Sequence, residues 1–248
     1  MATSLPLIGT FMIGVGGTGV IVALRYLLVS GGFAWWTVRR GIVAGPADAA
    51  RRTTQVRREI GWSLLAALIY AVPAGLALVA WRDFGWTRLY NDPDAYGWLW
   101  PPVSVLVYLL AHDSWFYWSH RLMHRPWWFA RIHAVHHASR PPTAWAAMSF
   151  HPWEALSGAW LFPALVFVVP IHWAALLVVL TVATFFGVTN HMGWEIFPKS
   201  FVSGPGRVLI TASHHELHHR RYNANYGLYF RVWDRLCGTD RGVAEWPK

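Results

Sequence analysis

The sequence has little cysteine and little charge. Cys237 is the only cysteine among 248 residues, which excludes an intrachain disulfide and argues against a thiolate metal site. Charged residues make up only 13% of the chain, whereas 55% of it is hydrophobic. A chain of this length could form one or two soluble domains, but several apolar runs approach or exceed the roughly 20 residues that a helix needs to span a bilayer. The sequence therefore predicts an integral membrane protein.

Acidic residues are scarce and lysine is nearly absent. The chain has 12 acidic residues against 21 basic ones, and arginine supplies 19 of the basic residues. This arginine usage suggests GC-rich codons and a bacterial source. A formal charge of +9 could indicate a nucleic-acid partner, but the arginines lie in loops beside apolar runs, where the positive-inside rule accounts for them. Because no nucleic-acid-binding motif accompanies them, we expect no nucleic-acid partner.

The long apolar runs predict three membrane spans, at about residues 5–29, 60–81 and 98–118. Tryptophans cluster near the ends of these runs, as in the aromatic belts of membrane interfaces. The first run has no basic segment before it, so we expect it to stay as a span and not to be cleaved as a signal peptide. The arginine-rich loop 35–59 marks the cytoplasmic side.

A fourth apolar stretch, residues 156–188, is interrupted by Pro163 and Pro170 and predicts a helical hairpin that enters and leaves on the cytoplasmic side. With the three spans it gives an all-α integral membrane protein with about four to five membrane-embedded helices. The histidine-rich segments 121–154 and 190–248 are expected to form a helical cap on the cytoplasmic side. The sequence has no repeat and no sign of a second domain, so we expect residues 1–248 to form a single domain.

The first span contains GVGGTG, residues 14–19, which matches the dinucleotide fingerprint G-x-G-x-x-G. That fingerprint requires a preceding strand and an acidic residue about 20 positions later. Here the flanks belong to a membrane span, and the first acidic residue after the motif is Asp48. We therefore interpret the glycines as small residues that allow close helix packing in lipid.

Three histidine clusters lie in the polar segments, and two of them have the same spacing. They are HRLMH, HAVHH and HELHH, which supply the candidate metal ligands His120, His124, His133, His136, His137, His215, His218 and His219. On a helix, positions three and four apart share a face, so each cluster can direct its imidazoles at one point. Neutral imidazole is the commonest metal ligand, and the repeated spacing argues against an adventitious cluster.

The other histidines are assigned one by one. His191 follows the second leg of the hairpin at the cytoplasmic surface and is a candidate further ligand. His214 points about 100° away from its neighbour on a helix and is left out of the metal site. His112 lies within the third span, about 12 Å along the axis from the first cluster, and we expect it to have a structural or hydrogen-bonding role. His172 falls at the hairpin turn, across the membrane, and is rejected.

Asp113 is the acidic residue that we assign to the site. It lies seven positions before His120 and eleven before His124, which returns it to nearly the same helix face. Its carboxylate is expected to accept a hydrogen bond from an imidazole and so to orient a metal ligand, with direct ligation as the alternative. Because eight histidines exceed the four positions of one zinc ion, we expect two metal ions. Imidazole suits Fe, Cu, Zn and Ni, so the spacing leaves the metal open.

The clusters and their surroundings resemble the fatty acid hydroxylase / sterol desaturase superfamily. Its pattern of H-x(3)-H, H-x-x-H-H and H-x-x-H-H occurs here in the same order. The segments DSWFYWSHRLMH, SFHPWEA, SHHELHHRRYNANYG and VWDRLCGT also resemble segments of that family. The resemblance covers about residues 113–239, and the first two spans carry no motif of the family.

The resemblance implies a non-haem diiron centre, held by about eight to ten histidines, that uses O2 to oxidise an unactivated C–H bond of a lipid. It implies that His191 is a ligand. Some branches have a second histidine in this region, where Glu195 stands here, so Glu195, Asn190 or water would complete that metal's shell. His151 is left open as a ligand, a partner of a ligand or a pocket residue. With no fused carrier in the chain, the resemblance implies an external electron donor, ferredoxin-like or a cytochrome, and its reductase.

We therefore predict an O2-dependent lipid hydroxylase or desaturase of a bacterial inner membrane, with hydroxylation slightly favoured. Sterol, fatty-acyl lipid and carotenoid substrates stay open. The alternative is a non-redox membrane metal protein, either a metal carrier with ligands near the midplane of its spans or a zinc hydrolase with three ligands and a general base. Four arginines near the histidines could hold an anionic headgroup or an acidic electron donor, or could face lipid phosphates: Arg121, Arg125, Arg131 and Arg140.

Overall fold

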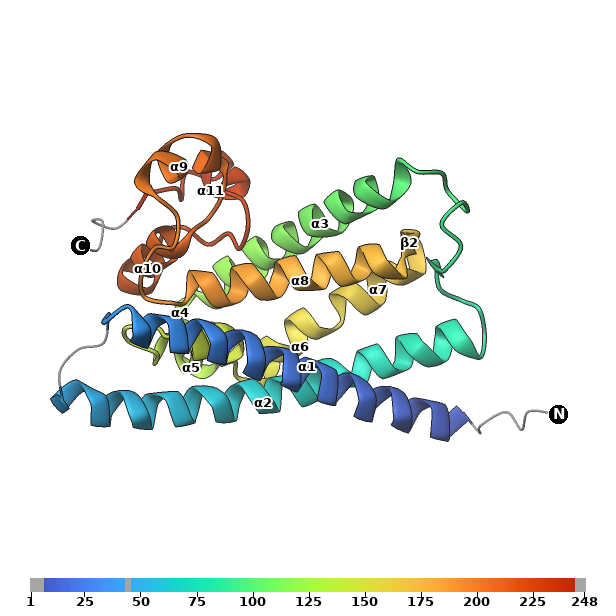
Figure 1. Cartoon of the computed structure of the whole chain (residues 1–248), viewed down its shortest axis with the longest axis horizontal. Coiled ribbons are helices and arrows are strands. Elements are labelled where there is room, and N and C mark those ends of the chain that lie inside the picture. The colour runs from blue at the N-terminus through green and yellow to red at the C-terminus, as the bar shows by residue number, and fades with distance from the viewer. Residues whose placement is uncertain (1–6, 43–45, 244–248) are drawn as a thin grey trace.

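A computed structural model describes residues 7–42 and 46–243, with the side chains of 46–51 left out of the description. Four long helices run along the molecule (Figure 1): α1 (Leu7–Arg39), α2 (Pro46–Arg82), α3 (Trp100–Met123) and α8 (Trp173–Asn190). The predicted all-α membrane fold is thereby confirmed. The first two helices reach beyond the predicted spans, so most of the predicted loop 35–59 is helical, which corrects that prediction. Residues 43–45 of this loop lie outside the described part of the chain.

Among the described residues, three helical segments are long and apolar enough to cross a membrane: Leu7–Arg39, Arg52–Arg82 and Trp173–Asn190. The predicted third span lies in α3, which has 24 residues and so has the length to cross a bilayer at about 1.5 Å per residue, but it is less apolar than the other three. Many leucines, isoleucines and valines of these helices are exposed. On a soluble protein so much exposed apolar surface would cause aggregation, whereas in a bilayer it faces lipid.

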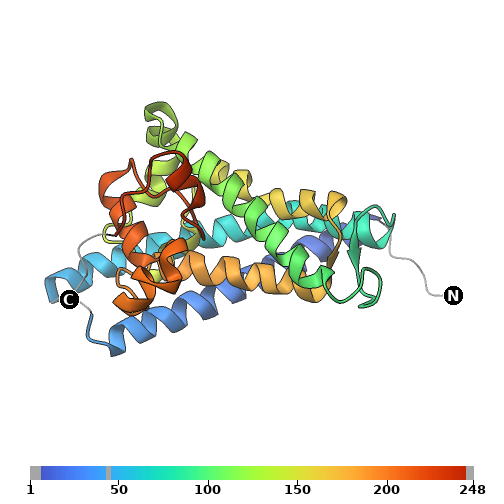
Figure 2. The ribbon, with the colours of Figure 1, turned by 90° about the horizontal axis from the view of Figure 1, so that it is seen from above.

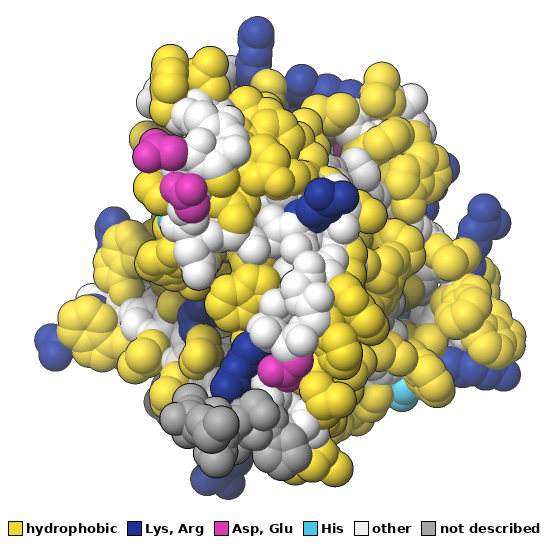
Figure 3. Space-filling model, turned by 90° about the vertical axis from the view of Figure 1, so that its right-hand side faces the viewer, with side chains coloured by type: hydrophobic (Ala, Val, Ile, Leu, Met, Phe, Trp, Pro, Cys, Tyr) yellow, Lys and Arg dark blue, Asp and Glu magenta, His cyan; other side chains and the backbone are white. Residues whose placement is uncertain are grey.

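The predicted hairpin is present, and its first leg is broken. α6 (Pro152–Ala159) and α7 (Leu161–Val168) form that leg, and α8 forms the second. Between them β2 (Ile171–His172) pairs in parallel with β1 (Leu89–Tyr90) from the loop after α2. The Tyr108 hydroxyl of α3 donates a hydrogen bond of 2.9 Å to the carbonyl of Val169. A buried apolar cluster around Tyr108 therefore anchors the end of the bundle away from the histidines, an end whose surface is largely apolar (Figure 3).

Close contact between α1 and α2 depends on glycines of both helices. A side chain on Gly75 of α2 would meet Val15 of α1 at 2.5 Å, and one on Gly14 would meet Leu78 at 2.9 Å. Gly19 lies near Ala71, whereas Gly16 and Gly17 have nothing within 4 Å of a built Cβ. The interpretation of the GVGGTG motif as a helix-packing surface is confirmed for its first and last glycines and is wrong for the middle two.

Short helices form a cap at one end of the bundle. After α3 come α4 (Pro126–Trp128), the π-helical turn η1 (Phe129–His133), α5 (Ala134–His137) and the 3-10 turn η2 (Ala144–Met148). After α8 come α9 (Lys199–Ser203), η3 (Pro205–Val208), α10 (Ala212–Arg221) and α11 (Val232–Leu236). The second series lies over the ends of α3 and α8 (Figures 1 and 2). The predicted histidine-rich helical cap is therefore present.

Candidate metal centre

The histidines of all three clusters meet where the cap covers the bundle. α3 delivers the first cluster from its last turns, η1 and α5 deliver the second, α10 delivers the third, and His191 follows the end of α8. All nine predicted ligands are buried except His124, which is half-buried. Buried imidazoles in such number are rare unless something pairs with them, because each removes a polar ring from water.

The nine side chains form two groups that could each hold a metal ion. Group one contains His120, His124, His133, His137 and His218, and group two contains His136, His191, His215 and His219. Within each group the ligand atoms lie within 4.8 Å of one another. The structure thus brings together the nine histidines that the sequence predicted as ligands, and their role as ligands stays a prediction.

The two H-x-x-H-H clusters are each divided between the groups. In HAVHH, the first and last histidines, His133 and His137, enter group one, and His136 enters group two. In HELHH, His215 and His219 enter group two, and His218 enters group one. The expectation that each cluster directs its imidazoles at one point is wrong here. Positions i and i+4 point at one site and i+3 at the other, since i+3 is offset by about 60° from the first position on a helix.

The spacing of the ring nitrogens fits metal coordination. Neighbouring Nε2 atoms lie 3.1 to 3.2 Å apart in group one and 2.9 to 3.2 Å apart in group two. Imidazole nitrogens about 2.1 Å from one ion would stand about 3.0 Å apart at right angles and about 3.4 Å apart in a tetrahedron. The observed separations are close to the right-angled value.

Hydrogen bonds made by Nδ1 determine that Nε2 is the ring nitrogen with the lone pair available for a metal. The Nδ1–H groups of His120, His218 and His191 donate to the carbonyls of Tyr226, Ala224 and Gly187 at 2.8, 2.8 and 2.6 Å. Because a carbonyl only accepts, the proton sits on Nδ1 and the lone pair on Nε2. These lone pairs face into the groups, where a cation would satisfy them, which is the arrangement usual for metal-ligating histidines.

Burial keeps these imidazoles in the neutral form that binds metal. Desolvation lowers the pKa of His191 to about 4. It also lowers the pKa of His136 and His215, and repulsion from neighbouring imidazoles lowers both further. A ring with a depressed pKa is unprotonated at neutral pH, so its Nε2 is available as a ligand.

Glu154 contacts the centre and was missed as a site residue by the sequence analysis. Its Oε1 accepts a hydrogen bond of 2.8 Å from Nδ1 of His133, and its Oε2 is buried without a hydrogen-bond partner. The side chains of His133 and Glu154 are both almost fully buried. The signal was available, since Glu154 is an acidic residue in the SFHPWEA segment at the start of an otherwise apolar leg.

Asp113 does not take the role that its helical position predicted. Its Oδ1 accepts hydrogen bonds from the backbone N–H groups of Leu228, Tyr229 and Phe230 at 3.2, 2.7 and 3.2 Å. The carboxylate therefore holds the loop after α10 and not an imidazole, because that loop crosses α3 at this height. The loop in turn supplies the two carbonyls, of residues 224 and 226, that orient histidines of group one.

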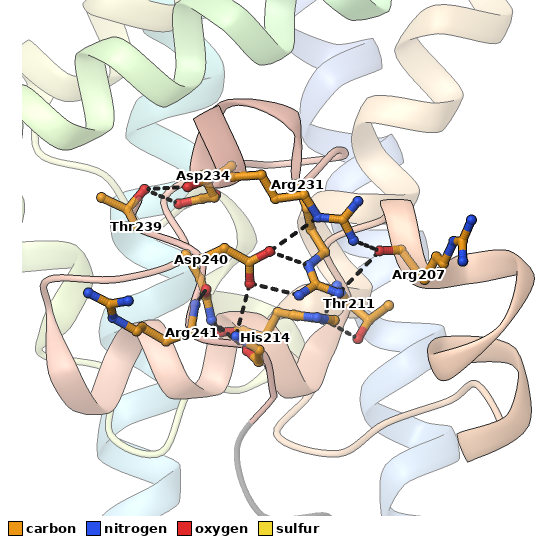
Figure 4. A network of polar contacts seen from close by, with 12 residues as sticks. Arg207, Thr211, His214, Arg231, Asp234, Thr239, Asp240 and Arg241 are labelled. Carbon is orange, nitrogen blue, oxygen red and sulfur yellow. Dashed lines mark hydrogen bonds and ion pairs between the residues drawn. The ribbon is translucent and has the colours of Figure 1, made fainter. Parts of the chain in front are cut away.

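His214 is buried but lies outside both groups, as its position on the helix predicted. Its Nδ1 contacts the backbone nitrogen and hydroxyl of Thr211, which closes the N-terminus of α10. Beyond it, the guanidinium of Arg231 donates to both carboxylate oxygens of Asp240 at 3.0 and 2.7 Å. Figure 4 shows this network in the C-terminal segment. Its effect is to fix the helix that carries the third cluster.

The possible additional ligands are placed elsewhere. Asn190 donates to the carbonyl of Leu228, and Glu195 accepts from the backbone nitrogens of Phe197 and Ser213. His151 accepts from the backbone nitrogen of Trp153 at the start of α6. Two further histidines are accounted for by hydrogen bonds: Nδ1 of His112 lies 2.6 Å from the hydroxyl of Tyr229, and His172 caps α8 at the far end.

A mostly apolar cavity of about 160 Å³ reaches the histidines from inside the bundle. Its walls come from α1, α2, α3, α6, α7 and α8 and include Tyr26, Phe116 and Phe162. At one end it touches two histidines from each group: His120, His133, His136 and His191. An apolar molecule in this cavity would therefore meet both candidate metal sites.

The fold and the site together indicate the class of protein. It is a helical membrane protein whose buried histidines form two groups of candidate ligands at the end of an apolar cavity. The comparisons with known proteins define the family. Residues 105–239 match the model of the fatty acid hydroxylase family, and these residues carry every histidine of both groups. The chain belongs to this family.

The curated relatives are sterol enzymes by name. The chain is 31% identical to the Delta(7)-sterol 5(6)-desaturase ERG3B of Gibberella zeae over 63% of this chain and 47% of that protein. It is 31% identical to the lathosterol oxidase of Mus musculus and 30% identical to that of Homo sapiens, each over 75% of this chain and 61% of the relative. The chain thus spans about half to three fifths of the length of these relatives. No solved structure matches it.

Proposed function

We propose that the protein is an oxidoreductase that hydroxylates or desaturates a membrane lipid at a centre of two iron ions. The observation that carries this proposal is the apolar cavity that ends on histidines of both groups. A metal carrier would need ligands within several spans, and a zinc hydrolase would need three ligands with a general base. Neither describes nine imidazoles in two adjacent groups.

Different residues of the chain would have different roles in this centre. The histidines of group one and group two would hold one ion each, and the iron pair, when bound, would supply the chemistry that uses O2 to attack a C–H bond. The carbonyls of residues 187, 224 and 226 and the carboxylate of Glu154 hold the imidazole rings in place through Nδ1. The apolar walls exclude water, which protects a reactive centre from side reactions.

The names of the relatives favour a sterol among the possible lipids, with desaturation and hydroxylation both open. Electrons would come from an external ferredoxin-like or cytochrome donor and its reductase. We place the histidine end on the cytoplasmic side of a bacterial inner membrane, because the exposed arginines Arg58, Arg125 and Arg220 lie at this end and positive charge favours the cytoplasm.

Metal analysis of protein purified without oxygen tests the centre. Two irons per chain are expected, and zinc alone would contradict the proposal. His133→Ala and His218→Ala each remove a ligand of group one and should lower the iron content. His172→Ala removes an imidazole at the far end of the bundle and serves as the control, with wild-type iron expected.

Lipid analysis of a host with and without the gene tests the activity. We expect a lipid that gains one oxygen or loses two hydrogens only when the gene is present. The same lipid should be missing in a host that carries His133→Ala. A lipid profile that is identical with and without the gene, in a host that supplies O2 and electron donors, would contradict the proposed activity.

A further inference from the structure

The cavity at the histidines is too small to hold a whole membrane lipid. Its volume of about 160 Å³ is close to that of an apolar cavity of about 150 Å³ that binds a single benzene ring. Sites that enclose ligands of ordinary drug size have about 300 to 1,000 Å³. A lipid with its reacting carbon in this cavity must therefore leave most of its length outside, which requires an opening in the wall.

A second cavity lies directly across one wall of the first. Its volume is about 720 Å³, and it shares four lining residues with the smaller cavity: Trp115, Ser119 and Met123 of α3 and Ser157 of α6. These four side chains are therefore the partition between the two. We call the larger cavity the tryptophan groove, because it is lined by Trp115, Trp118, Trp127, Trp128 and Trp153.

The tryptophan groove is open to the surroundings of the protein. Trp153 is 64% exposed and Trp127 is 55% exposed, and Leu122 beside them is exposed as well. The segment with α4, which carries two of the tryptophans, projects from the bundle beside the end of α3 (Figure 2). Tryptophan rings favour the boundary between lipid chains and headgroups. Arg131, whose guanidinium lies 4.5 Å from the centre of the Trp127 ring, places a positive charge at the same rim.

The partition consists of one large side chain and three smaller ones. The indole of Trp115 donates a hydrogen bond of 2.8 Å to the carbonyl of Ser157, and its ring packs edge-on against Trp160 at 4.8 Å. The rest of the partition consists of two serines, which are small, and of Met123, whose unbranched side chain adapts its shape readily. Trp115 is therefore the only bulky side chain among the four residues of the partition.

We propose that the lipid enters sideways between α3 and α6, with Trp115 as the gate and the tryptophan groove as the subsite for the part of the lipid that stays outside. This inference rests on the proposed function. The lipid presents its reacting carbon through the partition to the histidines, its apolar body lies against the indoles, and its polar end lies near Arg131.

Ser157→Trp tests the entrance by filling the partition. We expect oxidation of the lipid identified in the host to fall at least tenfold, while the iron content stays at the wild-type value. Leu106→Trp is the control, since Leu106 is an exposed residue of α3, the helix on the other side of the proposed entrance, and lines neither cavity. If Ser157→Trp keeps its iron and oxidises the lipid as fast as Leu106→Trp does, the entrance lies elsewhere.

A labelling experiment tests lipid binding without catalysis. In a Cys237→Ser background, the thiol of Ser157→Cys is treated with N-ethylmaleimide in delipidated detergent solution, with and without added lipid extract of the host. The extract should slow the labelling of Ser157→Cys several-fold more than that of Leu106→Cys. Equal effects on the two thiols would overturn the entrance. Because this result does not depend on turnover, it separates failure of the entrance from failure of the proposed function.

Discussion

At the scale of single residues, the chemistry of the site depends on which nitrogen of each ring is free. Three imidazoles donate Nδ1–H to backbone carbonyls, and His133 has its Nδ1 beside a carboxylate oxygen. The Nδ1 atoms of His136, His137, His215 and His219 have no hydrogen-bond partner among the described residues. The orientation of these four rings therefore depends on packing against their neighbours, whereas the carbonyls and the glutamate orient the first four rings.

Removal of the carboxylate that orients His133 should weaken metal binding. We expect Glu154→Ala to lower the affinity of group one by about 10- to 100-fold, the range typical for partners of metal-ligating histidines. Glu154→Gln, which keeps an oxygen acceptor, should retain more of the affinity. The measurement is metal retained by the purified protein in competition with a chelator.

The matched control is Glu216→Ala on α10, whose carboxylate pairs with the exposed Arg220. It should retain metal as the wild type does. Equal retention by Glu154→Ala and Glu216→Ala would show that Glu154 plays no part in holding the metal.

At the scale of the elements, the site depends on two kinds of close packing. The HAVHH cluster is spread over the π-helical turn η1 and α5, whereas the HELHH cluster lies on α10 alone, and each cluster serves both groups. Far from the metals, α1 and α2 approach so closely at Gly75 that a single methyl group would collide with Val15. These two helices supply the outer wall of the cavity, so their packing affects the site indirectly.

Gly75→Ala should destabilise the protein, because its Cβ would overlap a side chain and the backbone of α1. Overpacking of this kind costs about 1 to 3 kcal/mol. The measurement is the midpoint of thermal unfolding in detergent. Gly17→Ala is the control, since nothing lies within 4 Å of a Cβ there, and it should match or slightly exceed the wild type because alanine favours helix. A Gly75→Ala variant as stable as Gly17→Ala would refute the close approach.

At the scale of the whole molecule, the nine candidate ligand histidines form two groups, and the cap helix α10 lies at one end of a long bundle (Figure 1). The membrane helices exclude water from the cavity, and the cap excludes it from the imidazoles. The consequence is a molecule whose stability depends on pH, since so many buried imidazoles must stay neutral for the fold to persist.

Acidification should destabilise the metal-free protein. The pKa of His191 is about 4 in the folded chain, against about 6.5 when exposed, and the pKa values of His136 and His215 are lowered as well. As the pH falls from about 6.5 toward 4, the unfolded chain takes up protons that the folded chain excludes, so the free energy of unfolding decreases. Above pH 6.5 this contribution is fully present.

The measurement is the thermal midpoint of chelator-treated protein at pH 7.5 and pH 5.5, which should be lower at pH 5.5. Metal-loaded protein should also release its metal over this range, because ligation requires neutral imidazole. A midpoint that rises on acidification would contradict the burial of these rings as neutral groups.

From local sequence patterns we could predict the helical membrane fold, the position of the hairpin and the nine histidines that gather in the two groups. These follow from local properties: the length of apolar runs, the prolines between them, and residue types that tolerate burial only in pairs or with a metal. Local position also excluded two histidines from the ligand set. His172 lies at the far end of a span, and His214 lies on a different face of its helix from the ligand histidines.

Only the tertiary structure decided how the histidines are shared between the two groups, and what Asp113 and Glu154 contact. Spacing along a helix fixes the direction of a side chain but not what lies there. Asp113 meets a loop more than 110 residues later in the chain, and Glu154 meets a ring from the turn after α3. The cavity and the tryptophan groove likewise exist only between helices distant in sequence, where no local pattern could reveal them.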